Sequence, residues 1–363
     1  MWWYSTIFIG AAVLAAGLTV VVMYLATQAG IVDQSSTAPQ RKRQRQAKPL
    51  LGGLAMYGAI TALTVYLWPY ITTGYLLPKH LLGVLVAGGV VMIGGVCDDI
   101  WQLSPKQQII FPLLACFIII ASGIGIDYIT NPLGGILNVQ QWEIVLVEWR
   151  GLPYHLTWWA DLFTLLWLMG TMYSTKMLDG LDGLVPGIGV IGGLIIFLLS
   201  ISTTVAQPET GLLALLFAGA AAGFLVWNFS PAKIYLGEGG SLLCGLMLGT
   251  LAILSGSKIA TAVLILGLPI IDMVWVIVRR LLIEKRSPFS GDTLHLHFQL
   301  QALGLSDRTI AVIFYAITAV FGVSSLVVAG PQKMAILVVL ILLSVSLITW
   351  LYIRVQREQS SSS

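Results

Sequence analysis

Long apolar runs, each close to the length that crosses a lipid bilayer, recur along this chain of 363 residues. A helix that spans the hydrocarbon core needs about 20 predominantly apolar residues. Eleven runs approach this length: 3–27, 51–71, 81–97, 107–123, 159–178, 185–203, 210–228, 240–256, 258–281, 309–329 and 333–353. Because 57% of the residues are hydrophobic and only 10% are charged, the bilayer must be the solvent of this chain. The pattern predicts an all-α, polytopic membrane helix bundle with about 11 transmembrane helices.

The distribution of basic residues predicts the orientation of this bundle. The first run lacks a basic leading region and is longer than a signal-peptide core, so we expect a permanent first helix. Arg41, Lys42, Arg43, Arg45 and Lys48 follow it, and the positive-inside rule places this loop in the cytoplasm. With eleven spans, fifteen of the nineteen Lys and Arg residues lie on that side. The N-terminus is therefore expected outside and the C-terminus in the cytoplasm.

We expect one integral membrane domain over 1–363, since no repeat or Pro-rich linker divides the chain. Residues 124–156 form an external loop in which Ile136–Trp149 alternates like a short hairpin. Residues 282–308 form a cytoplasmic loop, and 355–363 a disordered tail. The three cysteines lie in or beside apolar runs without metal-binding spacing, so neither a disulfide nor a zinc site is indicated.

Acidic residues gather at the ends of the runs on the cytoplasmic side. They are Asp98 and Asp99 after the third run, Asp179 and Asp182 after the fifth, Glu238 at the eighth, Asp272 in the ninth and Asp292 in the loop that follows. Lys106, Lys176, His295 and His297 accompany them. Carboxylates in or beside membrane spans are costly and usually functional. A hard cation such as Mg²⁺ would relieve their repulsion and leave positions for phosphate oxygens.

Each acid alone also fits a simpler explanation, because aspartate is a common helix cap and turn former. The set as a whole fits that explanation less well. The glycines of Asp179-Gly-Leu-Asp182-Gly and Gly237-Glu-Gly-Gly-Ser241 would let the backbone approach a ligand closely, although glycine also serves turns and helix packing. We expect Asp98 and Asp99 to sit at a water-facing helix end.

The ordered motifs resemble those of the polyprenyl-phosphate N-acetylhexosamine-1-phosphate transferases. The motifs are Lys48-Pro-Leu-Leu-Gly-Gly53, Asp98-Asp99 with Leu103-Ser-Pro-Lys106, Leu178-Asp-Gly-Leu-Asp-Gly-Leu184, Asn228 with Pro231-Ala232 and Leu236-Gly-Glu-Gly-Gly-Ser241, and Asp292-Thr-Leu-His-Leu-His297. They span most of the chain. The resemblance implies a Mg²⁺-dependent enzyme, with Mn²⁺ as a substitute, that couples a polyprenyl phosphate to the sugar phosphate of a UDP-sugar and releases UMP.

The resemblance also implies roles for individual residues. It places Asp98 and Asp99 near the attacking prenyl phosphate, with Asp98 as a proposed general base. A prenyl phosphate already carries a nucleophilic oxyanion at neutral pH, so positioning and charge neutralisation are an alternative to proton removal. Lys106 would then provide a point charge for a phosphate.

The remaining roles concern the donor. The segment with Asp179 and Asp182 would hold ribose and uracil beside Asn228, and Tyr235 would stack on uracil. Tyr235 could instead belong to the interfacial aromatic belt, and Asn228 could simply cap a loop. His295 and His297 would lie near the sugar diphosphate, and a zinc site there would lack a third and fourth strong ligand. Lys48, Lys176 and Asp292 complete the expected substrate-binding set.

The sequence departs from the family pattern in three places. Glu238 stands where the family usually has a Mg²⁺-binding aspartate, and its extra methylene shifts the carboxylate outward. Tyr173 and Lys176 occupy positions where many relatives carry asparagine, and Phe298 follows His297 where a further histidine is frequent. The expected metal ligands are Glu238, Asp99 and Asp182.

Alternatives remain at this stage. The Asp-x-x-His-x-His pattern resembles the N-acetylglucosamine-type transferases of the family more than the muramoyl-pentapeptide enzyme, so the resemblance implies N-acetylglucosamine as the sugar, with a phospho-N-acetylmuramoyl-pentapeptide transferase as the second choice. An ion-coupled transporter that uses Asp272 is the rival of another class, although repeated halves with broken helices are not seen. Asp272 could also polarise a kinked helix end or pair with Lys176 or Arg279. The membrane, the prenyl lipid and the UDP-sugar are the expected partners; no nucleic acid is expected, and monomer and homodimer are both open.

Overall fold

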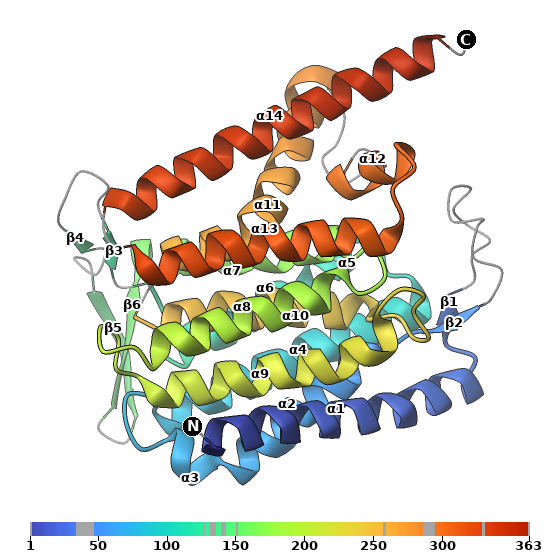
Figure 1. The fold of residues 1–363 in the computed structure, drawn as a ribbon. Coiled ribbons are helices and arrows are strands. Elements are labelled where there is room, and N and C mark those ends of the chain that lie inside the picture. Colours follow the sequence, from blue (N-terminus) through green and yellow to red (C-terminus); the bar gives the residue numbers. More distant parts are fainter. Residues whose placement is uncertain are drawn as a thin grey trace.

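The computed structural model describes residues 2–33, 47–126, 128–130, 136–138, 143–149, 152–256, 259–285, 295–328 and 331–361. Within these ranges the chain is mainly helical, and most of the long helices run along one common direction (Figure 1). The helices are α1 (Trp2–Gln28), α2 (Gly52–Tyr66), α3 (Trp68–Ile71), α4 (Pro78–Trp101), α5 (Pro105–Gln108), α6 (Ile110–Ala121), α7 (Trp158–Leu178), α8 (Leu184–Ser200), α9 (Pro208–Asn228), α10 (Gly237–Leu254), α11 (Ile259–Val278), α12 (Leu296–Ala302), α13 (Asp307–Val327) and α14 (Pro331–Ser361).

All eleven predicted runs coincide with helices. Seven helical segments are long and apolar enough to cross a membrane: Trp2–Gln28, Pro78–Trp101, Pro208–Asn228, Gly237–Leu254, Ile259–Leu282, Asp307–Val327 and Gln332–Trp350. Gly52–Tyr66, Pro105–Ala121 and Leu184–Ser200 are shorter apolar helices. Helix α7, with 21 residues, occupies the remaining run. The chain is therefore a multi-pass membrane protein, while the count of eleven spans and the orientation of the termini stay predictions.

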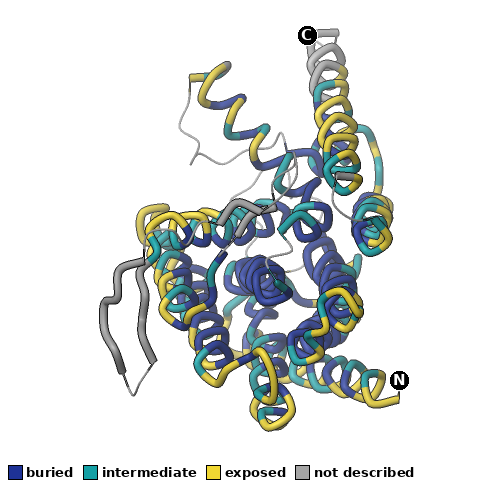
Figure 2. The backbone as a smooth tube through the Cα atoms, turned by 90° about the vertical axis from the view of Figure 1, so that its left-hand side faces the viewer, coloured by how far each residue is buried: buried dark blue, intermediate teal, exposed yellow. Residues whose placement is uncertain are grey.

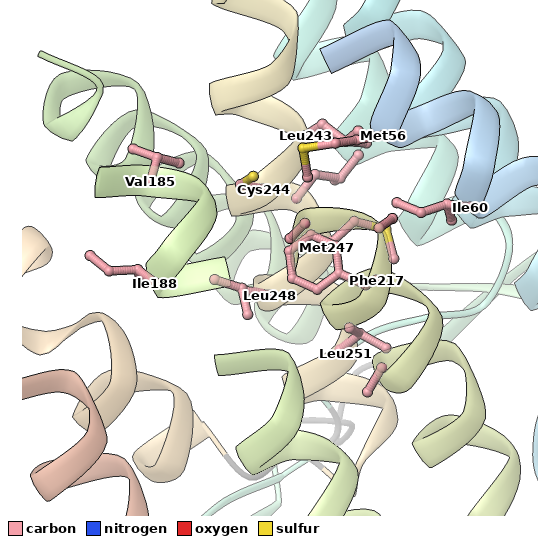
Figure 3. Close-up of a cluster of buried hydrophobic side chains, with 14 of the residues drawn as sticks. Met56, Ile60, Val185, Ile188, Phe217, Leu243, Cys244, Met247, Leu248 and Leu251 are labelled. Carbon is pink, nitrogen blue, oxygen red and sulfur yellow. The ribbon is translucent and has the colours of Figure 1, made fainter. Parts of the chain in front are cut away.

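Helix α10 is the centre of the bundle. It packs against α7, α4, α2 and α8, and 94% of Gly237–Leu254 is buried. In the view along the helices, buried residues gather in the inner helices and exposed residues lie on the outer ones (Figure 2). Met56 and Ile60 of α2, Phe217 of α9, and Met247 and Leu251 of α10 meet in this core (Figure 3). The outer helices expose apolar side chains, as expected where lipid is the solvent.

Short strands lie at the two ends of the bundle and form three antiparallel pairs among the described residues. The pairs are β1 (Val32–Asp33) with β2 (Lys48–Pro49), β3 (Tyr128–Thr130) with β4 (Ile136–Asn138), and β5 (Glu143–Trp149) with β6 (Leu152–Thr157). The predicted hairpin within Ile136–Trp149 was wrong in its pairing. That segment supplies β4 to a pair with β3 and β5 to a pair with β6.

Two other predicted loops contain helix. Helix α12 lies within the loop predicted at 282–308, and a π-helical turn, Arg279–Glu284, overlaps the start of this loop. Helix α14 continues to Ser361, so the tail predicted to be disordered is largely helical. Adding residues to an existing helix avoids the cost of nucleation, and Gln, Arg and Glu are good helix formers. The basic residues Arg41, Lys42, Arg43 and Arg45 lie outside the described residues.

Candidate active site

A cavity of about 1270 Å³ opens at the end of the bundle where β1 and β2 lie, opposite β3–β6 (Figure 1). Helices α4, α7 and α9 end there, and α10 and α13 begin there. Eight of the residues singled out from the sequence line it: Asp98, Asp99, Lys176, Asp179, Asp182, Asn228, Tyr235 and Glu238. These positions are up to 140 residues apart along the chain. Helices that alternate in direction bring their connecting segments to one end.

Asp98 holds the turn that follows α4. Its Oδ1 atom accepts hydrogen bonds from the Leu103 backbone N–H at 2.8 Å and from Gln108 Nε2 at 3.0 Å. Asp98 lines the cavity at the end of α4, although only 8% of the residue is exposed. The chain reverses at Gln102, whose φ is 50°, and this reversal folds α5 back over Asp98. Asp98 therefore stabilises the α4–α5 turn and also contributes a negative charge to the cavity lining.

Asp99 faces the first turn of α10. Its Oδ1 atom accepts a hydrogen bond from the Glu238 backbone N–H at 3.2 Å. The first N–H groups of a helix have no partner within the helix, and a carboxylate there is also favoured by the helix dipole. Gly237 allows this approach, because its φ is +78° and a β-carbon would lie 2.5 Å from Asp99 Oδ2. The Gly-Glu-Gly-Gly motif thus brings the Asp99 and Glu238 residues together.

Lys176, in the last turn of α7, connects these acids. Its Nζ atom lies 2.9 Å from Glu238 Oε2 and donates to Gln108 Oε1 at 3.0 Å. Gln108 in turn donates to Asp98, so one polar network runs from Asp98 through Gln108 and Lys176 to Glu238. We did not identify Gln108 from the sequence. The signal was a polar residue at the start of an apolar helix, two positions after Lys106.

Asp182 anchors the other side of the cavity. Its Oδ2 atom accepts a hydrogen bond from the Ala232 N–H at 2.8 Å and lies 3.4 Å from Lys48 Nζ. The Lys48 ammonium also lies 5.0 Å from the centre of the Tyr235 ring. These contacts join the motifs that begin at Lys48, Asp179 and Asn228, although Lys48 itself is not among the lining residues.

Asn228 fixes the loop between α9 and α10. It accepts from the Gly183 N–H at 3.0 Å and donates to the Ile234 carbonyl at 2.9 Å. Only 3% of Asn228 is exposed. The side chain therefore ties two cavity loops together, which is close to the loop-capping role considered from the sequence.

The two histidines lie behind the cavity wall. His295 Nδ1 is 2.9 Å from Asp272 Oδ2, and the Leu296 N–H donates to Asp272 Oδ1 at 2.9 Å. The rings of His295 and His297 are stacked, with centroids 5.8 Å apart. A β-carbon at Gly180 would overlap His297, so His297 packs directly against the Asp179–Gly183 segment.

Three expectations for this region need correction or stay open. Asp272 pairs with His295, the residue before α12, while Lys176 and Arg279, the partners considered from the sequence, pair with Glu238 and Glu284. Lys106 is exposed and does not line the cavity, since residues two apart in a helix point in nearly opposite directions and Gln108 faces inward. Asp292 lies outside the described residues.

The charge of the cavity is strongly negative. Among the described residues, seven carboxylates line it, from Asp33, Asp98, Asp99, Asp179, Asp182, Glu238 and Asp307, against two basic side chains, Lys176 and Arg308. Arg308 was not identified from the sequence as a site residue; it donates to the Ser230 carbonyl at 2.9 Å. An anionic ligand would be repelled here unless further positive charge accompanied it.

No group of three or more His, Cys, Asp or Glu side chains that could hold a metal occurs in the described part of the chain. This finding disfavours a closed protein cage such as a structural zinc site. Mg²⁺, however, is commonly held by one or two carboxylates together with substrate phosphates and water. The Glu238 side chain is 37% exposed and lies beside Asp99, so oxygen donors of this cavity fit Mg²⁺.

Comparison with known proteins gives consistent matches. Residues 81–256 match the family described as glycosyl transferase family 4. The chain is 31% identical to a probable undecaprenyl-phosphate N-acetylglucosaminyl 1-phosphate transferase of Bacillus subtilis, over 85% of this chain and 80% of that protein. It is 29% identical to a decaprenyl-phosphate N-acetylglucosaminephosphotransferase of Mycolicibacterium smegmatis, over 80% and 74% of the two chains. A phospho-N-acetylmuramoyl-pentapeptide-transferase of Moorella thermoacetica is 26% identical, over 80% and 87%.

Proposed function

The chain belongs to glycosyl transferase family 4, and we propose that it transfers N-acetylglucosamine 1-phosphate from UDP-N-acetylglucosamine to a polyprenyl phosphate such as undecaprenyl phosphate. An oxygen of the prenyl phosphate attacks the β-phosphorus of the donor. The bond from that phosphorus to the bridging oxygen breaks, and UMP leaves with the bridging oxygen. The product is a lipid-linked sugar diphosphate for cell-envelope glycan synthesis.

One observation carries this proposal: a polar cavity at the end of an apolar bundle brings together eight motif residues that the sequence spreads over the chain. A prenyl phosphate is embedded in the membrane, whereas a nucleotide sugar is dissolved in water. A cavity at the end of membrane-spanning helices is where the two can meet. We further propose eleven spans with the N-terminus outside, which puts the cavity at the cytoplasmic face, where the nucleotide sugar is available.

Both substrates are anions, and the cavity that would receive them is lined mostly by carboxylates. This mismatch supports a requirement for Mg²⁺ or Mn²⁺. Asp99 and Glu238 would hold the ion, and when bound it would neutralise charge on the donor diphosphate. Asp182, the third expected ligand, has its Oδ2 engaged by Ala232 and Lys48, so it is better placed to shape the loop at the nucleoside end.

The chain's own residues position the reactants. Asp98 fixes the α4–α5 turn, and because the attacking oxyanion needs no deprotonation, a positioning role suffices for it. Tyr235 and the Asp179–Gly183 segment would receive uracil and ribose, with Asn228 holding their loops. His297 packs against that segment, and His295 stacks on His297. The donor diphosphate would then lie toward Lys176 and Glu238.

The test is UMP release by the purified protein in detergent with undecaprenyl phosphate. We expect release with UDP-N-acetylglucosamine and Mg²⁺ or Mn²⁺, and none after chelation with EDTA. A donor panel that includes UDP-N-acetylmuramoyl-pentapeptide separates the two transferase activities found among the relatives. Release from the pentapeptide donor alone would contradict the proposed sugar, and release that persists in EDTA would contradict the cation requirement.

A further inference from the structure

The ammonium group of Lys176 contacts one carboxylate of the candidate active site and is linked by hydrogen bonds to a second. Lys176 Nζ is 2.9 Å from Glu238 Oε2 and 3.0 Å from Gln108 Oε1. Through Gln108 it is linked to Asp98, and Glu238 is linked through its backbone N–H to Asp99. A small side pocket is lined by Asp98, Gln108, Lys176 and Glu238 together. This arrangement places one positive charge directly against Glu238 and links it through hydrogen bonds to Asp98.

The Lys176–Glu238 ion pair is partly buried: its side chains are 18% and 37% exposed, and the Glu238 Oε2 atom is shielded from solvent. The position of this ion pair in the cavity has a consequence for metal binding. The oxygen that Lys176 contacts belongs to the carboxylate that would receive a divalent cation. An ammonium group on one oxygen of a carboxylate repels a metal ion that approaches the same carboxylate, so the two cations compete for Glu238.

Resting on the proposed function, we propose that Lys176 acts as an internal cation that occupies Glu238 when no divalent ion is bound and moves to a donor phosphate oxygen when one binds. The lysine side chain suits this exchange, because it is a point charge on a flexible four-carbon stem with three donors. Gln108 Oε1 accepts a hydrogen bond from the same ammonium group and could keep that contact while Lys176 exchanges Glu238 for a phosphate oxygen, because an ammonium has three donors. Lys176 is thus a positioning residue whose partner changes with the ligand.

Two consequences distinguish this role from a structural ion pair. Replacing Lys176 with the neutral, similarly long methionine removes the competitor, so Mg²⁺ should bind the substrate-free protein more tightly. A single and a double charge a few ångström apart interact strongly enough, even in salt water, to predict a roughly tenfold lower half-saturating Mg²⁺ concentration. The same variant loses its phosphate contact, so UDP should bind more weakly when Mg²⁺ is saturating.

The experiment is a Mg²⁺ titration of the melting temperature of the purified, substrate-free protein, followed by a UDP titration at saturating Mg²⁺. We expect Lys176→Met to shift the Mg²⁺ midpoint down and the UDP midpoint up, while Lys176→Arg, which keeps the charge, retains the wild-type Mg²⁺ midpoint. Lys233→Met is the matched control. Lys233 is exposed, and its ammonium lies over the Trp227 ring outside the cavity lining, so both midpoints should stay unchanged.

An unchanged or higher Mg²⁺ midpoint in Lys176→Met would overturn the inference, as would the absence of any Mg²⁺-dependent shift in both proteins. The melting temperature before Mg²⁺ is added shows whether the variant is folded, and a misfolded methionine variant is replaced by Lys176→Gln. These readouts do not need turnover. If the wild type releases no UMP but Lys176→Met still lowers the Mg²⁺ midpoint, the proposed reaction is refuted and the cation exchange is not. If the wild type releases UMP but Lys176→Met leaves the Mg²⁺ midpoint unchanged, the cation exchange is refuted and the proposed reaction is not.

Discussion

Replacing Asp98 separates its structural contribution from its charge. Asp98→Ala removes the acceptor of two hydrogen bonds, from Leu103 N–H and Gln108 Nε2, at a position that is 8% exposed. Hydrogen bonds to a charged group contribute about 1.5–3 kcal/mol each, and both share one oxygen, so we expect a loss of about 3 kcal/mol in the free energy of unfolding. Asp98→Asn keeps an oxygen acceptor and should lose only about 1 kcal/mol, because neutral hydrogen bonds are weaker.

Thermal unfolding and UMP release should be measured together on wild type and both variants. We expect Asp98→Asn to melt near the wild-type temperature and yet lose turnover, since the cavity charge is gone while the α4–α5 turn persists. Asp98→Ala should lose both turnover and stability. Equal melting temperatures for the two variants would show that Asp98 does not stabilise the α4–α5 turn. Near-normal UMP release by Asp98→Asn would show that the Asp98 charge is not needed for the reaction.

The other predictions concern the start of α10. Glu238→Gln keeps the side-chain size but removes the charge, so it should raise the Mg²⁺ concentration for half-maximal UMP release far more than it raises the UDP-sugar concentration required. Glu238→Asp should keep partial activity. If Glu238→Gln depends on Mg²⁺ as the wild type does, Glu238 is not a metal ligand. Gly237→Ala should lower activity strongly, because φ is +78° and the new methyl group meets Asp99. Gly30→Ala is its control: φ is +70°, but the new methyl group has no neighbour within 4 Å, so only the backbone strain of about 1–2 kcal/mol should appear in the melting temperature, without loss of turnover.

The fold was predictable to the extent that it depends on hydrophobicity. Each apolar run coincides with a helix, including the separate runs 240–256 and 258–281, where α10 ends at Leu254 and α11 begins at Ile259. Local backbone geometry was less predictable. The run at 51–71 divides into α2 and α3, and 107–123 begins in α5 and continues in α6. Hydropathy indicates whether a segment lies in lipid or in water, and it does not detect an interruption of the helix by one or two residues.

The candidate site was predictable as a set of residues but not as a set of contacts. Motif order identified most of the acids that line the cavity, but it missed Gln108, which bridges Asp98 and Lys176. It also assigned Lys106 to the site, although the side chain is exposed on α5 and does not line the cavity. Gln108 was missed because glutamine carries no charge and a search for charged residues does not detect it. Lys106 was wrongly assigned because the direction of a side chain in a short helix depends on how that helix packs against the rest of the bundle.

By itself, the sequence determined that this chain needs a bilayer, that its helices are about as long as the bilayer is thick, and that its acids lie at helix ends. Those properties follow from composition and spacing, which are local. Only the tertiary structure decided that Lys176 contacts Glu238, that Asp272 contacts His295 and that Asp182 contacts Lys48. Partners more than 20 residues apart meet only through helix packing, because contact geometry depends on the docking of whole helices and not on the residues between them.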